Sequence, residues 1–117
     1  GPVEVSVRVE NRPTEQYEQV DLVWYYADSH QVKIGQELVD GKLSIVMGRE
    51  EGDRTRTIAI IPLDSFVVDV RFRVEGTRIT GAFRTPASRS IRIFPATVIF
   101  TFITLRIRRR ATIASAG

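Results

Sequence analysis

Residues 66–75 read Phe-Val-Val-Asp-Val-Arg-Phe-Arg-Val-Glu, and no other stretch shows the class of secondary structure so clearly. Apolar side chains occupy every second position, and most of the positions between them are charged. A period of two is typical of a β-strand with one buried and one solvated face. The following Gly76-Thr77 pair predicts a turn, and residues 78–84 predict the returning strand.

The same pattern continues in both directions along the chain. Further strands are predicted over residues 3–10, 20–26, 31–39, 43–47, 55–61, 91–94 and 97–107. Asp40-Gly41 is a strong signal for a hairpin, residues 49–54 read as a charged loop, and Pro95 is expected to end a short strand. No stretch has a sustained helical period. The sequence therefore predicts an all-β antiparallel sandwich, jelly-roll-like and incomplete, with a small β-barrel as the alternative.

Composition excludes several kinds of site. The 117 residues include no cysteine and one histidine, His30, which excludes disulfides, thiolate zinc sites, thiol nucleophiles and paired imidazoles. No window of 18 apolar residues is present, so we expect no membrane span, and no signal peptide is visible. We expect no metal and no cofactor.

Charge is distributed unevenly. Residues 1–83 hold 14 acidic and 10 basic side chains, whereas residues 84–117 hold seven arginines and no acid. We predict one sandwich domain over residues 3–110, in which the sequence does not reveal the origin of residues 87–110. Gly1-Pro2 is typical of the remnant left when a protease removes an affinity tag, and residues 111–117 are expected to fray.

The middle of the chain resembles a known superfamily. Gln19 and Leu22, then the run Lys33-Ile-Gly-Gln-Glu-Leu-Val-Asp-Gly41, and the hairpin over residues 70–86 resemble concanavalin A-like lectins and glucanases. They are most similar to small bacterial jelly-roll modules, such as those at the C-terminal end of some β-xylosidases. The resemblance covers residues 3–86, with Asp21 in place of the usual glycine. Members are commonly longer, and the first strands of the sandwich are missing here.

The resemblance implies a non-catalytic, lectin-like module that binds carbohydrate on an exposed sheet. The residues that we expect to bind the ligand are Tyr25, Lys33, Glu37, Arg71 and Arg73. The alternative for Glu37 is a structural role, as an ion pair with Lys33, Arg71 or Arg73, because opposite charges on neighbouring strands pair routinely. A glycosidase would need a second carboxylate 5–10 Å from Glu37, for which Asp69 and Glu75 are the candidates.

Other candidates have structural explanations. Ser29, His30 and Asp28 share one turn and cannot form a catalytic triad, whose members come from separate elements. The acidic residues near Gly52 match no calcium loop. Trp24 and Tyr26 are expected in the core, with Tyr25 half exposed on the other face.

Two alternatives to carbohydrate binding remain open. The chain could be a truncated or chimeric β-domain without a natural ligand, held together by association. The arginines at 106 and 108–110, close to two phenylalanines, are compatible with a nucleic-acid-binding barrel, but charge runs usually solvate and no recognition motif accompanies them. We expect a homo-oligomer, a dimer or tetramer, because residues 98–107 are apolar on both faces.

Overall fold

The computed structural model of the protein describes residues 1–27, 29–87, 92–97 and 104–110, with side chains described for residues 1–26 and 29–87. Every regular element in these ranges is a β-strand, which confirms the all-β prediction. The strands are β1 (Val3–Glu10), β2 (Gln19–Ala27), β3 (His30–Val39), β4 (Lys42–Glu51), β5 (Arg54–Pro62), β6 (Val67–Glu75), β7 (Arg78–Arg84), β8 (Arg92–Thr97) and β9 (Thr104–Arg110).

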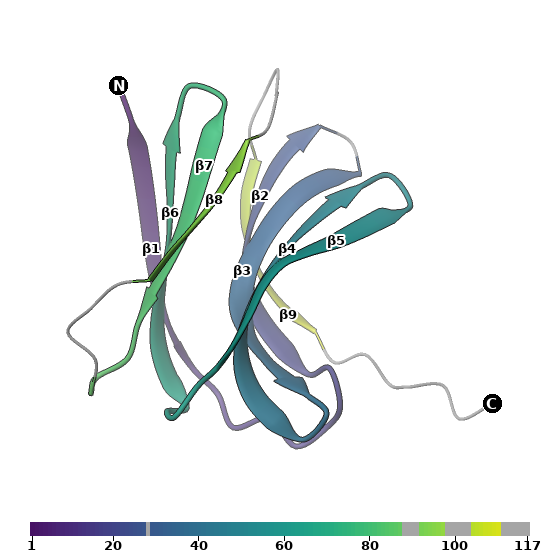
Figure 1. Ribbon diagram of the computed structural model, residues 1–117, viewed down its shortest axis with the longest axis vertical. Coiled ribbons are helices and arrows are strands. Elements are labelled where there is room, and N and C mark those ends of the chain that lie inside the picture. The colour runs from purple at the N-terminus through teal and green to yellow at the C-terminus, as the bar shows by residue number, and fades with distance from the viewer. Residues whose placement is uncertain (28, 88–91, 98–103, 111–117) are drawn as a thin grey trace.

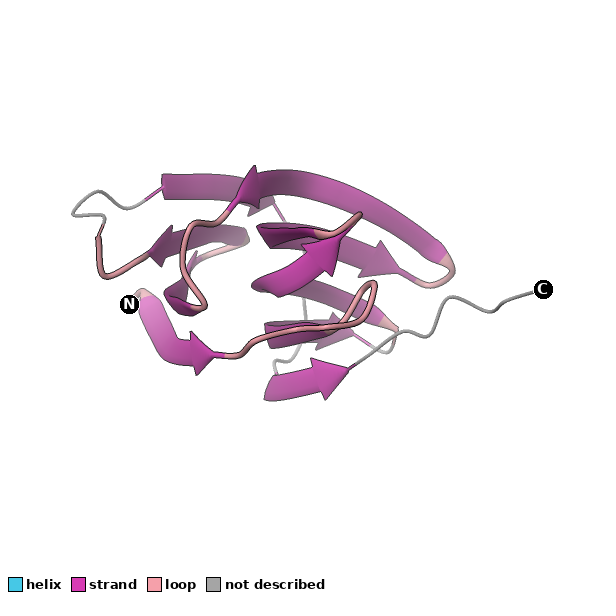
Figure 2. Ribbon diagram, turned by 90° about the horizontal axis from the view of Figure 1, so that it is seen from below, coloured by secondary structure: helices cyan, strands magenta, loops and turns pink. Residues whose placement is uncertain are grey.

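The strands form two antiparallel sheets that pack face to face. Sheet A has the order β1-β6-β7-β8, and sheet B has the order β5-β4-β3-β2-β9 (Figure 1). Figure 2 shows the same two layers from below. Among the described residues no strand pairing joins one sheet to the other. The sandwich prediction is therefore confirmed, and the barrel alternative is wrong.

The core lies between the sheets and is made by the apolar faces that the alternation predicts. On β6, Val68, Val70 and Phe72 are completely buried, and on β2 and β3 Leu22 and Ile34 are too. Side chains of sheet B pack closely against the backbone of sheet A at a glycine of β7. A Cβ atom added to Gly81 would lie 2.6 Å from the sulfur of Met47 and 3.0 Å from a methyl group of Ile34. The absence of that atom lets side chains of sheet B reach sheet A.

Short turns join the long strands. Asp40 and Gly41 have φ values of 51° and 75°, so both central residues of the predicted hairpin adopt positive φ, as a type I′ turn requires. The charged loop predicted over residues 49–54 is wrong. Strand β4 continues to Glu51 and β5 begins at Arg54, because Gly52, with φ of 64°, allows the chain to reverse within two residues.

The C-terminal strands differ from the prediction. Strand β8 runs through Pro95, which was expected to end it. Because β8 is the edge strand of sheet A, the missing N–H of proline costs no ladder hydrogen bond on its open side. The strand predicted over 97–107 is not observed as one piece: Thr97 ends β8, Thr104 begins β9, and residues 98–103 lie outside the described residues. The described part of the chain holds no helix with the length and apolarity needed to cross a membrane.

Candidate functional site on the outer faces of the sheets

The outward face of sheet B carries three of the five predicted site residues. Strand register places Gln19 opposite Glu37 and Val23 opposite Lys33, with Tyr25 further along β2 on the same face. Strands β3 and β4 bow toward sheet A, so this face is concave (Figure 1). We call the outward side chains of β2, β3 and β4 the concave face.

Polar side chains on the concave face are buried, although the described strands form no further layer over them. Five outward-facing polar residues of β2, β3 and β4 are at most 9% exposed: Gln19, Asp21, Gln31, Glu37 and Ser44. Val23, among them, is completely buried. Neighbouring side chains on a concave surface converge and cover one another. The face therefore presents a close-packed set of donors and acceptors.

Lys33 contacts two members of this set, Gln19 and Glu37. Its ammonium group donates a hydrogen bond to Gln19 Oε1 at 2.8 Å and lies 3.9 Å from Glu37 Oε1. The side chains of Lys33 and Glu37 are 11% and 12% exposed, so their ion pair is largely removed from water. The structure thus confirms Lys33 as the charge partner of Glu37. Removing one member of a buried pair typically costs about 3–5 kcal/mol, because the other charge is left uncompensated.

Two glycines make room for side chains that lie flat on the face. A Cβ atom on Gly35 would overlap the carboxylate of Asp21 and the backbone carbonyl of Val20. On β4, a Cβ atom on Gly48 would lie 3.4 Å from Cε of Lys33. The Lys33 stem therefore runs across the β4 backbone, and the Asp21 carboxylate occupies the space above β3.

The aromatic triplet divides between the two faces as predicted. Trp24 and Tyr26 are 3% and 2% exposed and belong to the core. Tyr25 lies on the concave face, opposite Gln31, and is half-buried. Tyr25 thus shares a face with Lys33 and Glu37 and is partly accessible there.

Arg71 and Arg73 lie elsewhere. Both belong to β6 of sheet A and face outward, on the opposite side of the sandwich from Glu37. The expectation that one site contains all five residues is therefore wrong, and neither arginine is the ion-pair partner of Glu37. Arg73 instead pairs with Glu4 at 3.1 Å and with Glu75 at 3.6 Å. Alternation shows that residues share a face of one strand, but not which sheet that strand joins.

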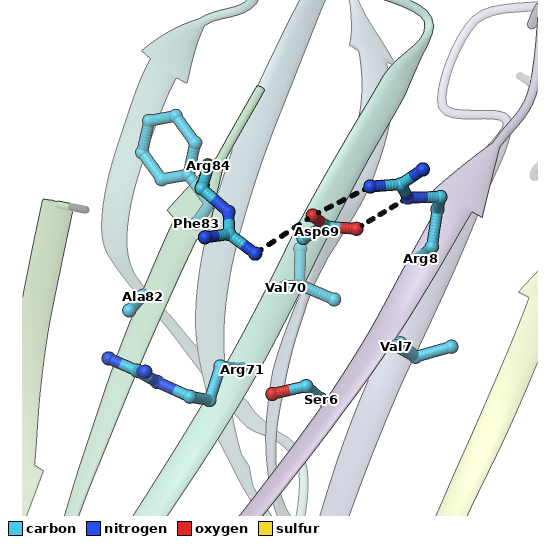
Figure 3. A pocket seen from close by; sticks show the side chains of 9 residues that line it. All are labelled: Ser6, Val7, Arg8, Asp69, Val70, Arg71, Ala82, Phe83 and Arg84. Atoms are coloured by element: carbon cyan, nitrogen blue, oxygen red, sulfur yellow. Dashed lines mark hydrogen bonds and ion pairs between the residues drawn. The ribbon is translucent and has the colours of Figure 1, made fainter. Parts of the chain in front are cut away.

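A hollow of about 260 Å³ lies on sheet A around Arg71 (Figure 3). We call it the sheet A hollow. Its outward-facing residues come from two rows across three strands: Arg8, Asp69 and Arg84, then Ser6, Arg71 and Ala82. Both small residues of the second row leave space beside the Arg71 side chain.

Asp69 connects two of the three arginines. It accepts hydrogen bonds from Arg8 Nε at 2.8 Å, Arg8 Nη2 at 3.2 Å and Arg84 Nη2 at 3.4 Å (Figure 3). The hydrogen bonds from Arg8, with the charges of both arginines, hold the pKa of Asp69 below its ordinary value. The carboxylate is therefore ionised across the neutral pH range and holds both guanidinium groups in place.

A third polar group lies at one end of the core. The Tyr26 hydroxyl donates to Glu51 at 2.9 Å and accepts from Arg49 Nε at 3.1 Å. The Tyr26 hydrogen bond lowers the pKa of Glu51, and burial raises the pKa of Tyr26. His30 packs against the edge of the Tyr26 ring, with 5.7 Å between centroids. These contacts give Glu51 and His30 a structural role. The described residues include no cluster of side chains able to hold a metal ion.

Sequence reasoning did not identify Gln19, Asp21, Arg8 or Arg84 as site residues. Gln19 and Asp21 become neighbours of Glu37 through the β2–β3 register. Arg8 and Asp69 are 61 residues apart and meet because β1 pairs with β6. The basic run of β9 has its backbone beside β2, with Arg108 opposite Asp21, but its side chains lie outside the described part of the structure.

Comparisons with known proteins support the fold. No protein-family model matches the chain, and no curated protein matches it. A solved GH43 protein from Bacillus licheniformis is similar over 80% of this chain, with a TM-score of 0.70 and 12% identity. A protein of unknown function from Saccharomyces cerevisiae is similar over 92%, with a TM-score of 0.72 and 19% identity.

This chain spans only part of each similar structure: 18% of the Bacillus licheniformis chain and 61% of the yeast chain. At these identities the likeness concerns the fold. That shared fold is an all-β antiparallel sandwich, in agreement with the two sheets described above.

Proposed function

We propose that this chain is a non-catalytic carbohydrate-binding sandwich and that the saccharide binds on the concave face of sheet B. The observation that carries the proposal is the close-packed set of Gln19, Lys33 and Glu37 on an outward face, beside the half-buried ring of Tyr25. In an outward face with no ligand, such groups would ordinarily extend into water.

The chemistry of this face suits a sugar. A saccharide combines hydroxyl groups, which both donate and accept, with ring faces that carry C–H groups. The accessible parts of Lys33 and Glu37 would donate to and accept from hydroxyl groups. Gln19, which is 3% exposed, would hold the Lys33 ammonium in position through its own hydrogen bond. Tyr25 would stack on a ring face, since tyrosine offers apolar area with a polar edge. Because the positions of these polar groups are set before the ligand arrives, they would determine the orientation of the bound saccharide.

The similarity to a GH43 protein adds a second line of support, because it links this architecture to a glycoside hydrolase chain. We propose that this chain itself does not hydrolyse. Asp69 and Glu75 cannot pair with Glu37 across a glycosidic bond, since they face outward from the other sheet. Asp21 shares the concave face but is only 1% exposed, and its carboxylate is packed over Gly35.

Binding can be tested by screening neutral oligosaccharides on a glycan array and then titrating a bound one into the ¹⁵N-labelled protein. We expect amide shifts in β2 and β3, and a tenfold or greater loss of affinity in Tyr25→Ala. Phe66→Ala is the matched control, because Phe66 is 39% exposed and directly precedes β6 of the other sheet. No binding to any neutral glycan, or equal binding by Tyr25→Ala, would refute the proposal.

The absence of catalysis has its own test. Incubation with aryl xylosides and with β-glucans should release no product above the level of a buffer blank. Release that the wild type shows and Glu37→Gln lacks would instead identify a glycosidase with Glu37 in its active site.

A further inference from the structure

The sheet A hollow contains more positive charge than the fold needs. Arg8, Arg71 and Arg84 line it with one carboxylate, Asp69, which leaves an excess of two positive charges. Like charges that share a small surface repel one another. Water screens Arg8 and Arg84, whose side chains are 66% and 55% exposed, more than the half-buried Arg71. An anion bound beside Arg71 would offset the excess charge.

Arg71 is the central residue of this hollow. It lies in the middle of β6, half-buried, and the described side chains give it neither a hydrogen bond nor an ion pair. Asp69 is occupied by Arg8 and Arg84, while Glu4 and Glu75 pair with Arg73. The Arg71 guanidinium thus keeps all five of its N–H donors for another partner.

Donors also remain on the flanking arginines. Asp69 accepts two hydrogen bonds from Arg8 and one from Arg84, and each guanidinium has five N–H groups. Because the carboxylate holds both groups in place, little side-chain entropy would be lost when they bind a ligand. The hydroxyl of Ser6, on the far side of Arg71 from Ala82, adds a further donor.

The size of the hollow limits what it can hold. Its volume of about 260 Å³ lies below the roughly 300–1,000 Å³ typical of sites that enclose a whole drug-sized ligand. It has room for one charged group and the atoms next to it. Guanidinium groups match the geometry of oxyanions and bind them through paired N–H donors.

We propose that the sheet A hollow binds an oxyanion, the carboxylate or sulfate group of an acidic ligand, and that Arg71 is its principal contact. Arg8 and Arg84 would contribute charge and secondary hydrogen bonds, with Asp69 as their positioning residue. The site is on the opposite outer face from the concave face, so the proposal does not depend on neutral saccharide binding.

The test is a titration of the ¹⁵N-labelled chain with glucuronate, with sulfate and with glucose, at constant ionic strength set by chloride. We expect saturable shifts at the amides of Ser6, Arg71 and Ala82 with glucuronate, sulfate or both, and none there with glucose. Binding of glucuronate alone would identify a carboxylate site, and binding of sulfate alone would identify a sulfate-ester site. No saturable shift with either anion would overturn the proposal.

Two variants distinguish a specific contact made by Arg71 from a general effect of positive charge. Arg71→Gln should weaken anion binding about tenfold or more, as expected for loss of a charge-assisted hydrogen bond. Arg73→Gln removes the same charge from the same face of the same strand, but from an arginine already paired with Glu4. It should change the affinity less than twofold. An equal effect of the two substitutions would show a nonspecific charge effect and refute the site.

Failure of this site and failure of the saccharide proposal are distinguishable. Neutral glycans should shift the amide signals of β2 and β3 in sheet B, and anions should shift those of β1, β6 and β7 in sheet A. Either set of shifts can be lost while the other remains.

Discussion

Gly35 shows how a single residue makes the concave face possible. A side chain at this position would meet a backbone carbonyl, that of Val20, which cannot move without breaking the β2–β3 pairing. The neighbouring Asp21 carboxylate occupies the same space. Asp21 lies directly opposite Gly35 in the β2–β3 register, so the acidic side chain and the glycine form one local arrangement.

We predict that Gly35→Ala destabilises the fold by about 1–3 kcal/mol or more, the usual cost of overpacking. Gly48→Ala is the matched control on the same face, because its Cβ would lie at 3.4 Å from the flexible Lys33 stem and 3.6 Å from a backbone oxygen. Urea unfolding of both variants measures the difference. Equal free energies of unfolding would contradict this account of the face.

Asp69 provides a prediction about pH. Its pKa is lowered in the folded state, chiefly by the hydrogen bonds from Arg8, so the unfolded chain binds its proton more readily. Its contribution to stability is therefore complete above the unfolded-state pKa of about 3.9 and is lost as the pH falls through the lower folded-state value.

The measurement is the thermal midpoint of wild type and Asp69→Asn between neutral pH and strong acid. Wild type should be the more stable at neutral pH, by a modest margin, because the Arg8 side chain is 66% exposed and water screens the pair. The margin should shrink as the pH falls below 4. A margin that stays constant in acid would show that the Asp69 charge does not contribute.

At the scale of elements, β6 shows where alternation stops describing the structure. The apolar pattern includes Phe66, but the strand begins at Val67, and Phe66 is 39% exposed. The backbone carbonyl of Phe66 accepts two hydrogen bonds, from Asn11 N at 3.2 Å and from Gln36 Nε2 at 2.9 Å. Its ring lies 4.6 Å from the guanidinium of Arg12. Six residues later, Phe72 is completely buried.

The same substitution at these two positions should therefore have very different costs. Phe72→Ala removes a ring from the central core and should cost about 3–5 kcal/mol. Phe66→Ala loses a cation–π contact at an exposed position, worth about 0.5–1 kcal/mol. Chemical denaturation monitored by Trp24 fluorescence compares them. If the two costs were alike, the assignment of the core to the space between the sheets would be wrong.

At the scale of the whole molecule, both sheets end in strands with one open edge: β1 and β8 in sheet A, and β5 and β9 in sheet B. Ile60 on β5 is 51% exposed, and Val3 on β1 is 48% exposed. Open edges favour pairing with another chain unless charge or proline opposes it. Charge and proline oppose such pairing at the two ends of β5, at Arg54, Arg56 and Pro62, more than in its middle.

We propose that the protein is a homo-oligomer, and light scattering after size-exclusion chromatography tests it. We expect a dimer or tetramer at tens of micromolar, and a shift toward monomer in Ile60→Lys, which places a charge at the apolar part of an edge strand. Ile60→Val, which keeps the edge apolar and adds no charge, is the control and should remain associated. A monomeric wild type would refute the proposal. The apolar run that first suggested association falls partly on residues 98–103, outside the described structure.

Local sequence patterns were enough to predict most of the strands, the Asp40-Gly41 hairpin, the inward face of β6 and the division of Trp24 from Tyr25 between two faces. These features follow from local rules, because side chains alternate with a period of two and turns need particular backbone angles. Only the tertiary structure decided that β1 pairs with β6, that Arg71 and Glu37 face opposite ways, and that Gln19 reaches Lys33. Pairing between distant strands depends on how the whole chain buries its apolar faces together, and alternation within one strand carries no information about its partner.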